Sequence, residues 1–445
     1  WRGWVMNCKV TYDRLEDMCE LVIDCPHSTP KWTDTGVIVL RNQNIRNGDL
    51  DLSNPSFTDE EHFRSRVRRA VPHAGDIVFT REAPMGEVCL IPENLKCCLG
   101  QRQVLLRAKP EIDSRYLFWA LQSQYVQNQI SWNEGTGTTV SNVRIPVLKD
   151  LKIPRHECES EIANLLSYIA KKITLNTQVN QTFEQMAQAL FKSWFVDFDP
   201  VIDNALKAGN AIPEPLAERA ARRQAIGAKA PARLPAQTRR LFPDRFEEDE
   251  VLGWVPVGWR STRLSDISVE LRRGISPKYI EEGGIRVINQ KCIRHHEVDF
   301  TPCRRNDPSV KKVDGRFLEV GDLLVNSTGT GTLGRVAMIE QLSEPTVVDS
   351  HVTVVRVDPE VYPKHVFAQQ MIFLEPHVTA LGEGSTGQTE LSRKRISNIA
   401  IVMPEFKCLE QLEARIRVFS LARSRNRNQV DVLTQLRDTL LPKLL

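Results

Sequence analysis

The sequence of 445 residues lacks the marks of membrane and secreted proteins. It contains no apolar run of about eighteen residues, the length that a helix needs to cross a bilayer. Its first residues also lack the charged and apolar regions of a signal peptide. We therefore expect a cytoplasmic protein with no membrane partner. The 41% hydrophobic and 26% charged residues exclude disordered and collagen-like chains and predict two or three domains with real cores.

Net charge and closely spaced cysteine pairs are scarce as well. The formal net charge is only +3, so any nucleic-acid surface has to be a local patch. The ten cysteines include no CxxC pair, which favours reduced thiols. Cys292, His295, His296 and Cys303 are of zinc-binding types, but their spacing fits no common zinc module. We expect a strand edge with a loop there, and no metal site.

Enzyme motifs are missing too. The sequence shows no P-loop lysine and no acidic pair followed by lysine at nuclease spacing. Residues 329–334 satisfy GxGxxG, but residues 335–339 have the pattern of a strand, whereas phosphate binding needs a helix N-terminus at that point. We expect no catalytic residue and no cofactor on this chain.

What the sequence does contain is a repeat of almost its whole length. Three β-type segments recur at an offset of about 250 residues, at 36–45 and 284–293, 74–79 and 320–325, and 103–107 and 352–356. Each copy then passes through a glycine-rich loop, at 134–139 or 383–389, to a proline. Because the apolar strands and glycines repeat while the polar tips differ, the pattern indicates two binding modules on one scaffold.

After each proline the period becomes helical, with a heptad seam. We expect these seam and partner-binding positions in the first helix: Ile162, Leu166, Ile169, Asn176, Phe183, Leu190, Trp194, Phe195 and Phe198. In the second helix we expect Leu412, Ile416, Phe419, Asn426, Leu433, Leu440 and Leu444. Asn176 and Asn426 occupy the same repeat position, where a seam asparagine fixes register at the expense of stability. A break in the helix at that point is the alternative.

Residues 205–243 separate the copies and hold eight basic but only two acidic residues. We expect a tether with one short helix around 215–224 that cannot bury a core. Its basic residues could also touch phosphates.

Three junction segments are distinctive: ALFKSWFVDFDPV at 189–201, LFPDRF at 241–246 and GWVPVGW at 253–259. With the tandem order, they make essentially the whole chain resemble the specificity subunit of type I restriction-modification systems. The resemblance implies an α+β fold in which two β-rich α/β target-recognition domains are separated and joined by two long helices, packed as an antiparallel coiled coil with pseudo-twofold repetition. The expected parts are recognition domains at 1–154 and 251–404, helical spacers at 155–200 and 405–445, and a linker, partly disordered or a short helix, at 201–250.

The resemblance also implies partners and a division of labour. Each domain would read one half of a bipartite double-stranded DNA target, and the helices would hold two methyltransferase subunits and restriction-translocase subunits. S-adenosylmethionine, ATP and Mg²⁺ would belong to those partners. A helix of about 40 residues is roughly 60 Å long, against about 34 Å for one DNA turn, so paired helices could set the distance between half-sites.

Bases are read by Arg, Lys, Asn, Gln, Ser and Thr side chains on loops that enter a groove. In the first copy the candidates are Arg41, Asn42, Gln43, Asn44, Arg81, Gln101, Arg102, Thr136, Thr138 and Thr139. In the second copy they are Asn289, Gln290, Lys291, Asn326, Ser327, Thr328, Ser350, His351, Ser385, Thr386 and Gln388. For each residue a solvated loop position is the alternative.

Arginine and lysine clusters suit phosphate contacts, which position a protein on DNA without specifying a sequence. The candidates are Arg64, Arg66, Arg68, Arg69, Arg272, Arg273, Lys278, Arg393, Lys394 and Arg395. A solvated helix face is the alternative for the first four.

The aromatic group at the end of the first helix has two interpretations, core packing or an anchor for a methyltransferase subunit, and we favour mixed use. Two other functions stay open, a self-sufficient DNA methyltransferase or nuclease and a tandem coiled-coil scaffold that binds only protein.

Overall fold

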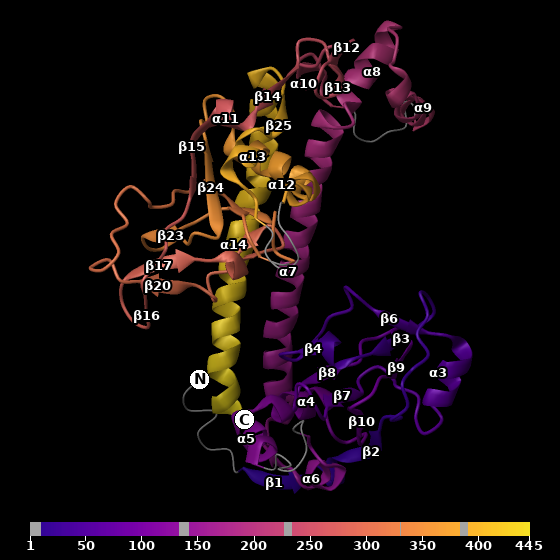
Figure 1. Cartoon of the computed structure of the whole chain (residues 1–445). Coiled ribbons are helices and arrows are strands. Elements are labelled where there is room, and N and C mark those ends of the chain that lie inside the picture. Colours follow the sequence, from indigo (N-terminus) through magenta and orange to yellow (C-terminus); the bar gives the residue numbers. More distant parts are fainter. Residues whose placement is uncertain (1–9, 133–141, 227–233, 330, 383–389) are drawn as a thin grey trace. The chain divides into compact units, whose positions relative to one another are not determined.

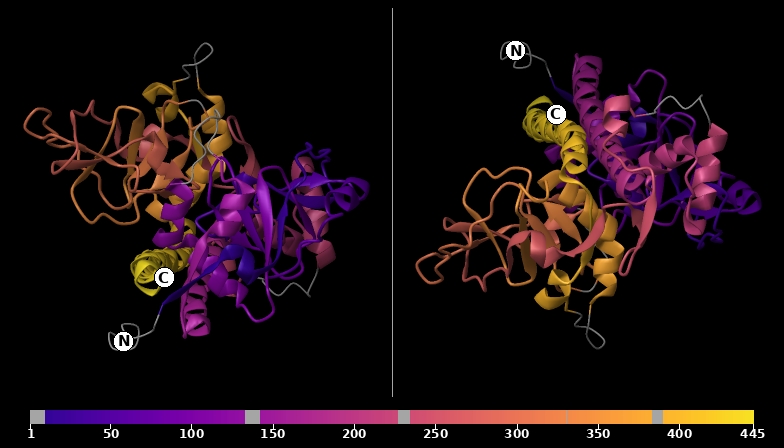
Figure 2. Two further views of the ribbon diagram at one scale, coloured as in Figure 1. Left: turned by 90° about the horizontal axis from the view of Figure 1, so that it is seen from below. Right: turned by 90° about the horizontal axis from the view of Figure 1, so that it is seen from above.

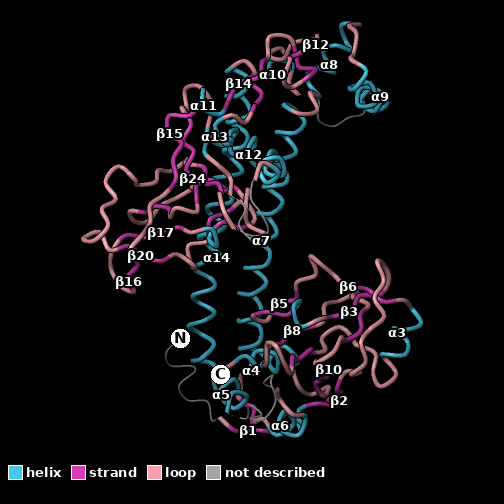
Figure 3. Tube along the Cα trace, in the orientation of Figure 1, coloured by secondary structure: helices cyan, strands magenta, loops and turns pink. Residues whose placement is uncertain are grey.

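The computed structural model describes residues 10–132, 142–226, 234–329, 331–382 and 390–445 (Figure 1). Contacts divide the chain into two compact units. Unit 1 comprises Trp1–Thr177 and Asn428–Leu445, and unit 2 comprises Gln178–Arg427. Both units combine β-sheets with helices (Figure 3), which confirms the expected α+β class.

Unit 1 contains a four-stranded antiparallel sheet and a three-stranded sheet. The larger sheet is formed, in spatial order, by β2 (Cys19–Asp24), β10 (Gln103–Ala108), β7 (Ile77–Thr80) and β8 (Val88–Leu90). The smaller is formed by β6 (Ser56–Thr58), β3 (Val37–Leu40) and β9 (Cys97–Leu99). Two further pairs are β1 (Thr11–Arg14) with β11 (Lys152–Arg155), and β4 (Ile45–Arg46) with β5 (Asp49–Leu50). All four residues of β7 are buried, because Ile77 and Phe79 face one core cluster and Val78 faces another.

Unit 2 repeats this plan. Its main sheet is formed by β15 (Ser268–Arg273), β24 (Val352–Val357), β21 (Leu323–Asn326) and β22 (Val336–Met338). The second sheet is formed by β16 (Tyr279–Ile280), β20 (Arg304–Asn306), β17 (Ile285–Ile288) and β23 (Thr346–Val348). The pairs are β14 (Arg260–Arg263) with β25 (Ala400–Met403), β18 (Ile293–Arg294) with β19 (Glu297–Val298), and β12 (Phe246–Asp249) with β13 (Gly253–Pro256). The matching strand order confirms the internal repeat.

Each unit also contains shorter helices besides its strands. In unit 1 they are α2 (Leu15–Met18), α3 (Glu60–Arg66), α4 (Ser114–Gln122), α5 (Gln124–Trp132) and α6 (Ile145–Asp150). In unit 2 they are α11 (Leu264–Ile267), α12 (Lys364–Ala380) and α13 (Arg393–Ser397). Tyr116 of α4 and Tyr362 just before α12 are both fully buried, and their hydroxyls donate to the carbonyls of Pro154 in β11 and Val402 in β25, at 2.6 and 3.5 Å.

The repeated Gly-Asp pairs place a buried ion pair at the start of a central strand. Asp76 accepts hydrogen bonds from Nε and Nη2 of Arg107, both at 2.8 Å. Asp322 accepts the same pair from Arg356, at 2.6 and 2.8 Å. The glycine before each aspartate has a φ of +84° or +106°, which favours glycine. A structural clamp therefore explains why the glycine, the aspartate and the later arginine all repeat.

Two long helices, α7 (Glu159–Phe195) and α14 (Phe406–Leu444), contribute to both units. In unit 1 Leu444 packs in one core with Ile162, and Asn176 Nδ2 lies 3.0 Å from Gln429 Oε1. Figure 2 shows the end of α14, in yellow, beside α7 in both of its views.

In unit 2 the same two helices meet through other residues. Asn426 Nδ2 donates to Asn180 Oδ1 at 3.0 Å, and the rings of Phe183 and Phe419 stack at 5.7 Å. Residues of α7 with increasing residue numbers contact residues of α14 with decreasing residue numbers. The two helices are therefore antiparallel in each unit, as predicted. Both seam asparagines lie inside continuous helix, so the alternative of a helix break is wrong.

The segment between the copies is more structured than the sequence predicts. It forms α8 (Asp199–Ala208), η2 (Glu214–Leu216), α9 (Ala217–Ile226) and α10 (Ala236–Arg239). Phe242 lies in the main core of unit 2, which corrects the expectation that residues 205–243 bury no core. Arg219 and Arg223 pair with Asp199 at 2.8 and 3.2 Å, so these basic residues serve the fold.

A buried ion network joins the helices of unit 2 to its sheets. Arg423 on the α14 seam, 7% exposed, pairs with Glu184 of α7 and with Glu297 of β19, the latter at 2.8 Å. Arg427, one turn later, lies 2.9 Å from Glu340 and also contacts Glu297. Burial alone would lower the pKa of Arg423, but Glu184 and the other carboxylates raise it. Arg423 in this seam therefore connects α14 to α7 and β19 through specific ion pairs, and is not simply a missing apolar contact.

We predict that Arg423→Ala lowers the free energy of unfolding by about 3–5 kcal/mol, because it leaves buried carboxylates without their cation. Arg417→Ala, at an exposed position of the same helix, should change it by no more than about 0.5 kcal/mol. Denaturant unfolding of the purified chain measures both. Equal effects of the two variants would show that the network contributes nothing to stability.

Candidate nucleic-acid interface

Three loops of unit 1 meet at one end of the large sheet, and each carries predicted reading residues. Asn42, in the 3-10 helix η1 (Asn42–Asn44), donates from Nδ2 to the Glu82 carbonyl. The Arg81 backbone N–H donates to the Arg102 carbonyl at 2.8 Å, and Arg102 pairs with Glu82 at 3.2 Å. The loops after β3, after β7 and before β10 therefore form a single surface.

Unit 2 builds the same surface with other side chains. The Ser327 backbone N–H donates to the His351 carbonyl at 2.9 Å, which matches the bond between Arg81 and Arg102. Thr328 Oγ1 lies 2.7 Å from His351 Nδ1, and Asn326 Nδ2 donates to the Gln290 carbonyl at 3.0 Å. Gln290 belongs to the 3-10 helix η4 (Gln290–Cys292), the counterpart of η1.

The candidates that face solvent at these edges are polar and mostly unlike between the units. In unit 1 the exposed candidates are Arg41, Gln43, Gln101 and Arg102. In unit 2 the exposed candidates are Lys291 and His351, and the half-buried ones are Asn289, Gln290, Thr328 and Ser350. Side chains of this kind can donate to and accept from base edges in a groove.

Four predicted reading residues point inward instead, which corrects their assignment. Asn44, Asn326 and Ser327 are at most 5% exposed, because each ends a strand or caps a turn. Arg81 donates to both carboxylate oxygens of Asp24 at 2.9 Å and to the Val143 carbonyl at 3.0 Å, so its guanidinium is committed to the fold.

The glycine-rich loop candidates Thr136, Thr138, Thr139, Ser385, Thr386 and Gln388 lie outside the described residues.

Asn42, half-buried, leaves its Oδ1 without a partner within the described structure. In unit 2, burial raises the pKa of Asp349 although its carboxylate accepts the His351 backbone N–H. This aspartate fixes the turn that presents His351.

The phosphate candidates also separate into structural and exposed residues. Arg66 is 8% exposed and donates to the carbonyls of Leu99 and Gly100 at 2.9–3.1 Å, among others. Arg272 is 7% exposed and donates to the carbonyl of Arg316 at 3.0 Å. Arg273 and Arg395 are half-buried and also donate to backbone carbonyls, the former at 2.7 Å to Leu391 and the latter at 2.7 Å to Leu381. We therefore assign these four to the fold, whereas the exposed group is Arg64, Arg68, Arg69, Lys278, Arg393 and Lys394.

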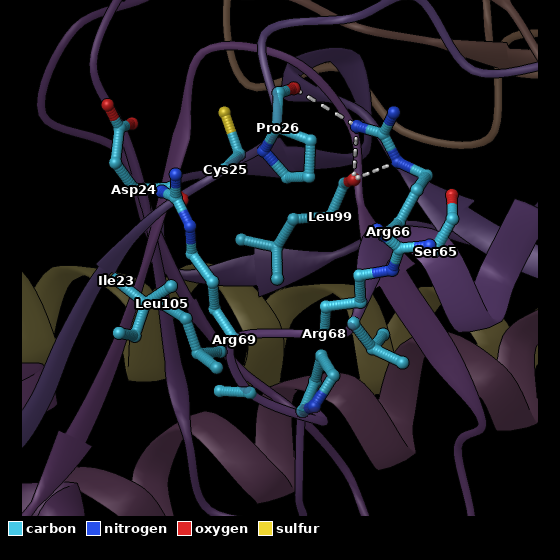
Figure 4. A pocket seen from close by; sticks show the side chains of 13 residues that line it. Ile23, Asp24, Cys25, Pro26, Ser65, Arg66, Arg68, Arg69, Leu99 and Leu105 are labelled. Atoms are coloured by element: carbon cyan, nitrogen blue, oxygen red, sulfur yellow. Dashed lines mark hydrogen bonds between the residues drawn. The ribbon is translucent and has the colours of Figure 1, made fainter.

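Arg66, Arg68 and Arg69 line a cleft in unit 1 with a volume of about 230 Å³ (Figure 4). Arg66 points to the backbone beside Pro26 and Leu99, while the Arg69 side chain extends toward Asp24, whose carbonyl lies 3.5 Å from Arg69 Nη1. Ile23 and Leu105 form part of its apolar wall. The cleft places two exposed cations at the same end of the sheet as Asp24, next to the reading loops.

The aromatic group of α7 is core. Phe191, Trp194, Phe195 and Phe198 are at most 8% exposed, and the Phe195 ring lies 5.4 Å from the Trp259 ring. The structure therefore shows core packing within unit 2, and the four rings present no exposed anchor.

Sequence reasoning missed several residues of the interface. Asp24 and Glu82 hold Arg81 and Arg102, and Trp32, 46% exposed, lies under the Arg41 guanidinium at 5.3 Å. A tryptophan in a polar loop is a signal that could have drawn attention to this position. The aspartate and glutamate carry no local pattern.

Metal-ligating side chains do not gather within the described part of the chain. No group of three or more His, Cys, Asp or Glu residues there is placed to hold an ion. Cys292 and Cys303 do meet, with sulfurs 3.6 Å apart, but the two histidines do not join them in a metal-binding group.

Two copies of one sheet-edge surface on a helical scaffold define a tandem recognition protein. Residues 9–185 match the family described as the type I restriction modification DNA specificity domain. The HindI specificity subunit of Haemophilus influenzae is 29% identical over 317 residues, covering 66% of this chain and 68% of the relative. The MjaIX specificity subunit of Methanocaldococcus jannaschii is 22% identical over 382 residues, covering 83% of this chain and 76% of the relative.

The fold agrees with these relatives. The crystal structure of a type I restriction-modification S subunit from M. genitalium has a TM-score of 0.58 and 16% identity, covering 99% of this chain and 97% of that one. The chain is therefore similar over most of its length to the specificity subunits of type I restriction-modification systems, and residues 9–185 match their DNA specificity domain. Across the described ranges, no helix is long and apolar enough to cross a membrane.

We predict that Arg66→Ala lowers the free energy of unfolding by about 2–4 kcal/mol, because several buried carbonyls lose a charged donor. Arg64→Ala, on the exposed face of the same helix, should cost no more than about 0.5 kcal/mol. Thermal and denaturant unfolding report both values. A destabilisation by Arg64→Ala as large as that by Arg66→Ala would refute the structural assignment of Arg66.

Proposed function

We propose that this chain reads a bipartite double-stranded DNA target, with the loop surface of each unit contacting one half-site. The observation that supports this most is the repeated three-loop edge, which keeps its backbone hydrogen bonds and changes its exposed side chains. Identical backbone frames with different polar groups would give two readers of different sequences. A specificity subunit of this kind would act in the cytoplasm, where its DNA is.

We further propose that α7 and α14 serve as spacer and as docking surface for two methyltransferase subunits, with restriction-translocase subunits joining the complex. A helix of 37 residues rises about 55 Å, longer than one DNA turn of about 34 Å. Paired helices resist bending better than a flexible linker, which favours a fixed half-site spacing. S-adenosylmethionine, ATP and Mg²⁺ would be bound by the partner subunits.

The decisive test is a genome-wide map of modified adenines with and without this gene. One split motif should vanish when the gene is removed. In cells that carry Arg41→Ala only the first half of the motif should relax, and with Lys291→Ala only the second, since loss of a base contact costs about 1–3 kcal/mol. Lys312→Ala, at an exposed position elsewhere in unit 2, is the matched control.

Other outcomes would point to other functions. Relaxation of the same half-motif by both variants would contradict one half-site per unit. Methylation or cleavage of DNA by the purified chain alone would establish the self-sufficient enzyme. A complex with methyltransferase that fails to shift any duplex would support the protein-only scaffold.

The arginines at the cleft of unit 1 should contact phosphates. We expect the Arg68→Ala, Arg69→Ala double variant to weaken binding to all duplexes equally and to reduce the slope of log K against log salt by about 2, close to one per phosphate contact. Fluorescence anisotropy titrations at salt concentrations of about 50 to 200 mM give the slope of log K against log salt, which reports the number of phosphate contacts. A change in sequence preference with an unchanged slope would instead assign these residues to base reading.

A further inference from the structure

Two cysteine side chains meet next to the reading segment of unit 2. Cys292 Sγ, in η4, lies 3.6 Å from Cys303 Sγ, and both residues are free thiols. Cys292 is fully buried, while Cys303 is partly exposed. A reagent can therefore reach one member of the pair from solvent, and the other lies directly behind it.

The backbone holds the two thiols together. Asn289 Nδ2 donates to the Pro302 carbonyl at 3.0 Å, and the Asp299 backbone N–H donates to the Cys292 carbonyl at 2.8 Å. These bonds connect η4 to the segment 299–303 on both sides of the sulfur contact. The thiols are therefore pre-positioned by the fold, which is what favours reaction between two cysteines.

Unit 1 places an asparagine where unit 2 has Cys292. Asn44 Oδ1 accepts the Arg41 backbone N–H at 2.9 Å, and Asn44 Nδ2 donates to the Asp51 carbonyl at 2.9 Å. In unit 2 the cap is a sulfur, since the Asn289 backbone N–H lies 3.4 Å from Cys292 Sγ. The reading segment of unit 1 is thus fixed by an inert amide, and that of unit 2 by a group whose covalent state can change.

The electrostatics of the pair differ from those of other buried cysteines. The hydrogen bond from Cys303 lowers the pKa of Cys292 below its usual value, although burial acts against this, and the same contact raises the pKa of Cys303. Burial raises the pKa of Cys19 and Cys408 to about 12. Since the thiolate is the nucleophile in disulfide chemistry, Cys292 is better prepared for reaction than these.

We propose that Cys292 and Cys303 form a redox modification site, which a low-molecular-weight disulfide converts to an intramolecular disulfide that changes how unit 2 presents Gln290 and Lys291. The effect on DNA rests on the proposed function, whereas formation of the disulfide does not. The reduced pair corresponds to the geometry described above.

The chemistry is a two-step thiol–disulfide exchange. The more accessible Cys303 Sγ attacks one sulfur of the small disulfide while its proton passes to the adjacent Cys292 thiolate, forming a mixed disulfide and releasing one small thiolate. The Cys292 thiolate then attacks Cys303 Sγ, forms the intramolecular bond and releases the second small thiolate. The two protein thiols give up two electrons to the small disulfide, and their two protons pass to the released thiolates.

Closure requires the sulfurs to approach from 3.6 Å to about 2.05 Å. Rotation of the cysteine side chains or a shift of η4 or of segment 299–303 supplies this approach, and a displacement of Cys292 Sγ takes it away from the Asn289 N–H. Specific contacts tolerate displacements of only about 0.5 Å. Oxidation should therefore weaken reading of the second half-site and leave the first unchanged.

The first experiment tests the modification on the purified full chain. After equilibration in glutathione redox buffers and thiol blocking, peptide mass spectrometry should find Cys292 linked to Cys303, and the Cys303→Ser variant should lack this link. Phenylarsine oxide binds pairs of neighbouring thiols. The Cys303→Ser variant should take up one equivalent less of it than the unmodified chain, and the control variant Cys158→Ser should take up the same amount as the unmodified chain. Absence of the linked peptide under oxidising buffer, or equal arsenical uptake by all forms, overturns the proposal.

The second experiment tests the consequence for DNA in the complex with its methyltransferase subunits. Oxidation should weaken binding to the mapped duplex about five- to a hundredfold, the effect of losing one base contact, and the loss should vanish when the second half-motif is scrambled. Cys292→Asn, which copies Asn44 of unit 1, should bind equally in both buffers. A disulfide that forms without changing affinity overturns the effect on reading. If neither redox state prefers the motif, the proposed DNA function fails, and the linked peptide still decides the modification.

Discussion

The structure depends on a buried carboxylate–guanidinium clamp that occurs once in each copy. Asp76 is 3% exposed and Asp322 is 1% exposed, and a carboxylate buried to that degree is costly unless it is paired and hydrogen-bonded. Arg107 and Arg356 reach them from the neighbouring strand, directly beyond the pairs Leu106–Ile77 and Val355–Leu323. Any shift of one residue would separate acid from base, so the clamp fixes the register of the central strands.

The clamp matters for function because the reading loops begin at the opposite end of the same strands. The last pairs there are Gln103 with Thr80 and Val352 with Asn326. With the register fixed at one end, the loops at the other end can change sequence without disturbing the sheet. The copies in fact diverge at that end, where unit 1 pairs Arg81 with Asp24 and unit 2 pairs Arg273 with Glu390. The clamp is therefore the same in both copies, while the ion pairs at the loop end differ.

Periodicity explains which parts could be predicted from the sequence. The repeat, the apolar strands and the two helices follow from patterns of two and of three to four residues, and the structure contains them. Orientation at strand ends could not be predicted, because alternation stops where a strand becomes a loop. Arg81 and Ser327 come directly after a strand, yet an ion pair turns the first inward and a hydroxyl pair, Ser327 Oγ with Thr353 Oγ1 at 2.6 Å, turns the second. Such partners are distant in sequence and leave no local signal.

The seam between α7 and α14 also depends on partners that are distant in sequence. In unit 1, Leu440, Leu441 and Leu444 pack with the apolar core around Ile162, whereas in unit 2 the corresponding tie is the network around Arg423. An apolar contact tolerates sliding and rotation, since dispersion and burial are non-directional. A guanidinium shared among several carboxylates accepts only a few geometries. The part of the seam in unit 2 has fewer apolar positions, but its ion network restricts the orientation of α14 more strongly. A count of hydrophobic seam positions therefore underestimates how tightly α14 is oriented within unit 2.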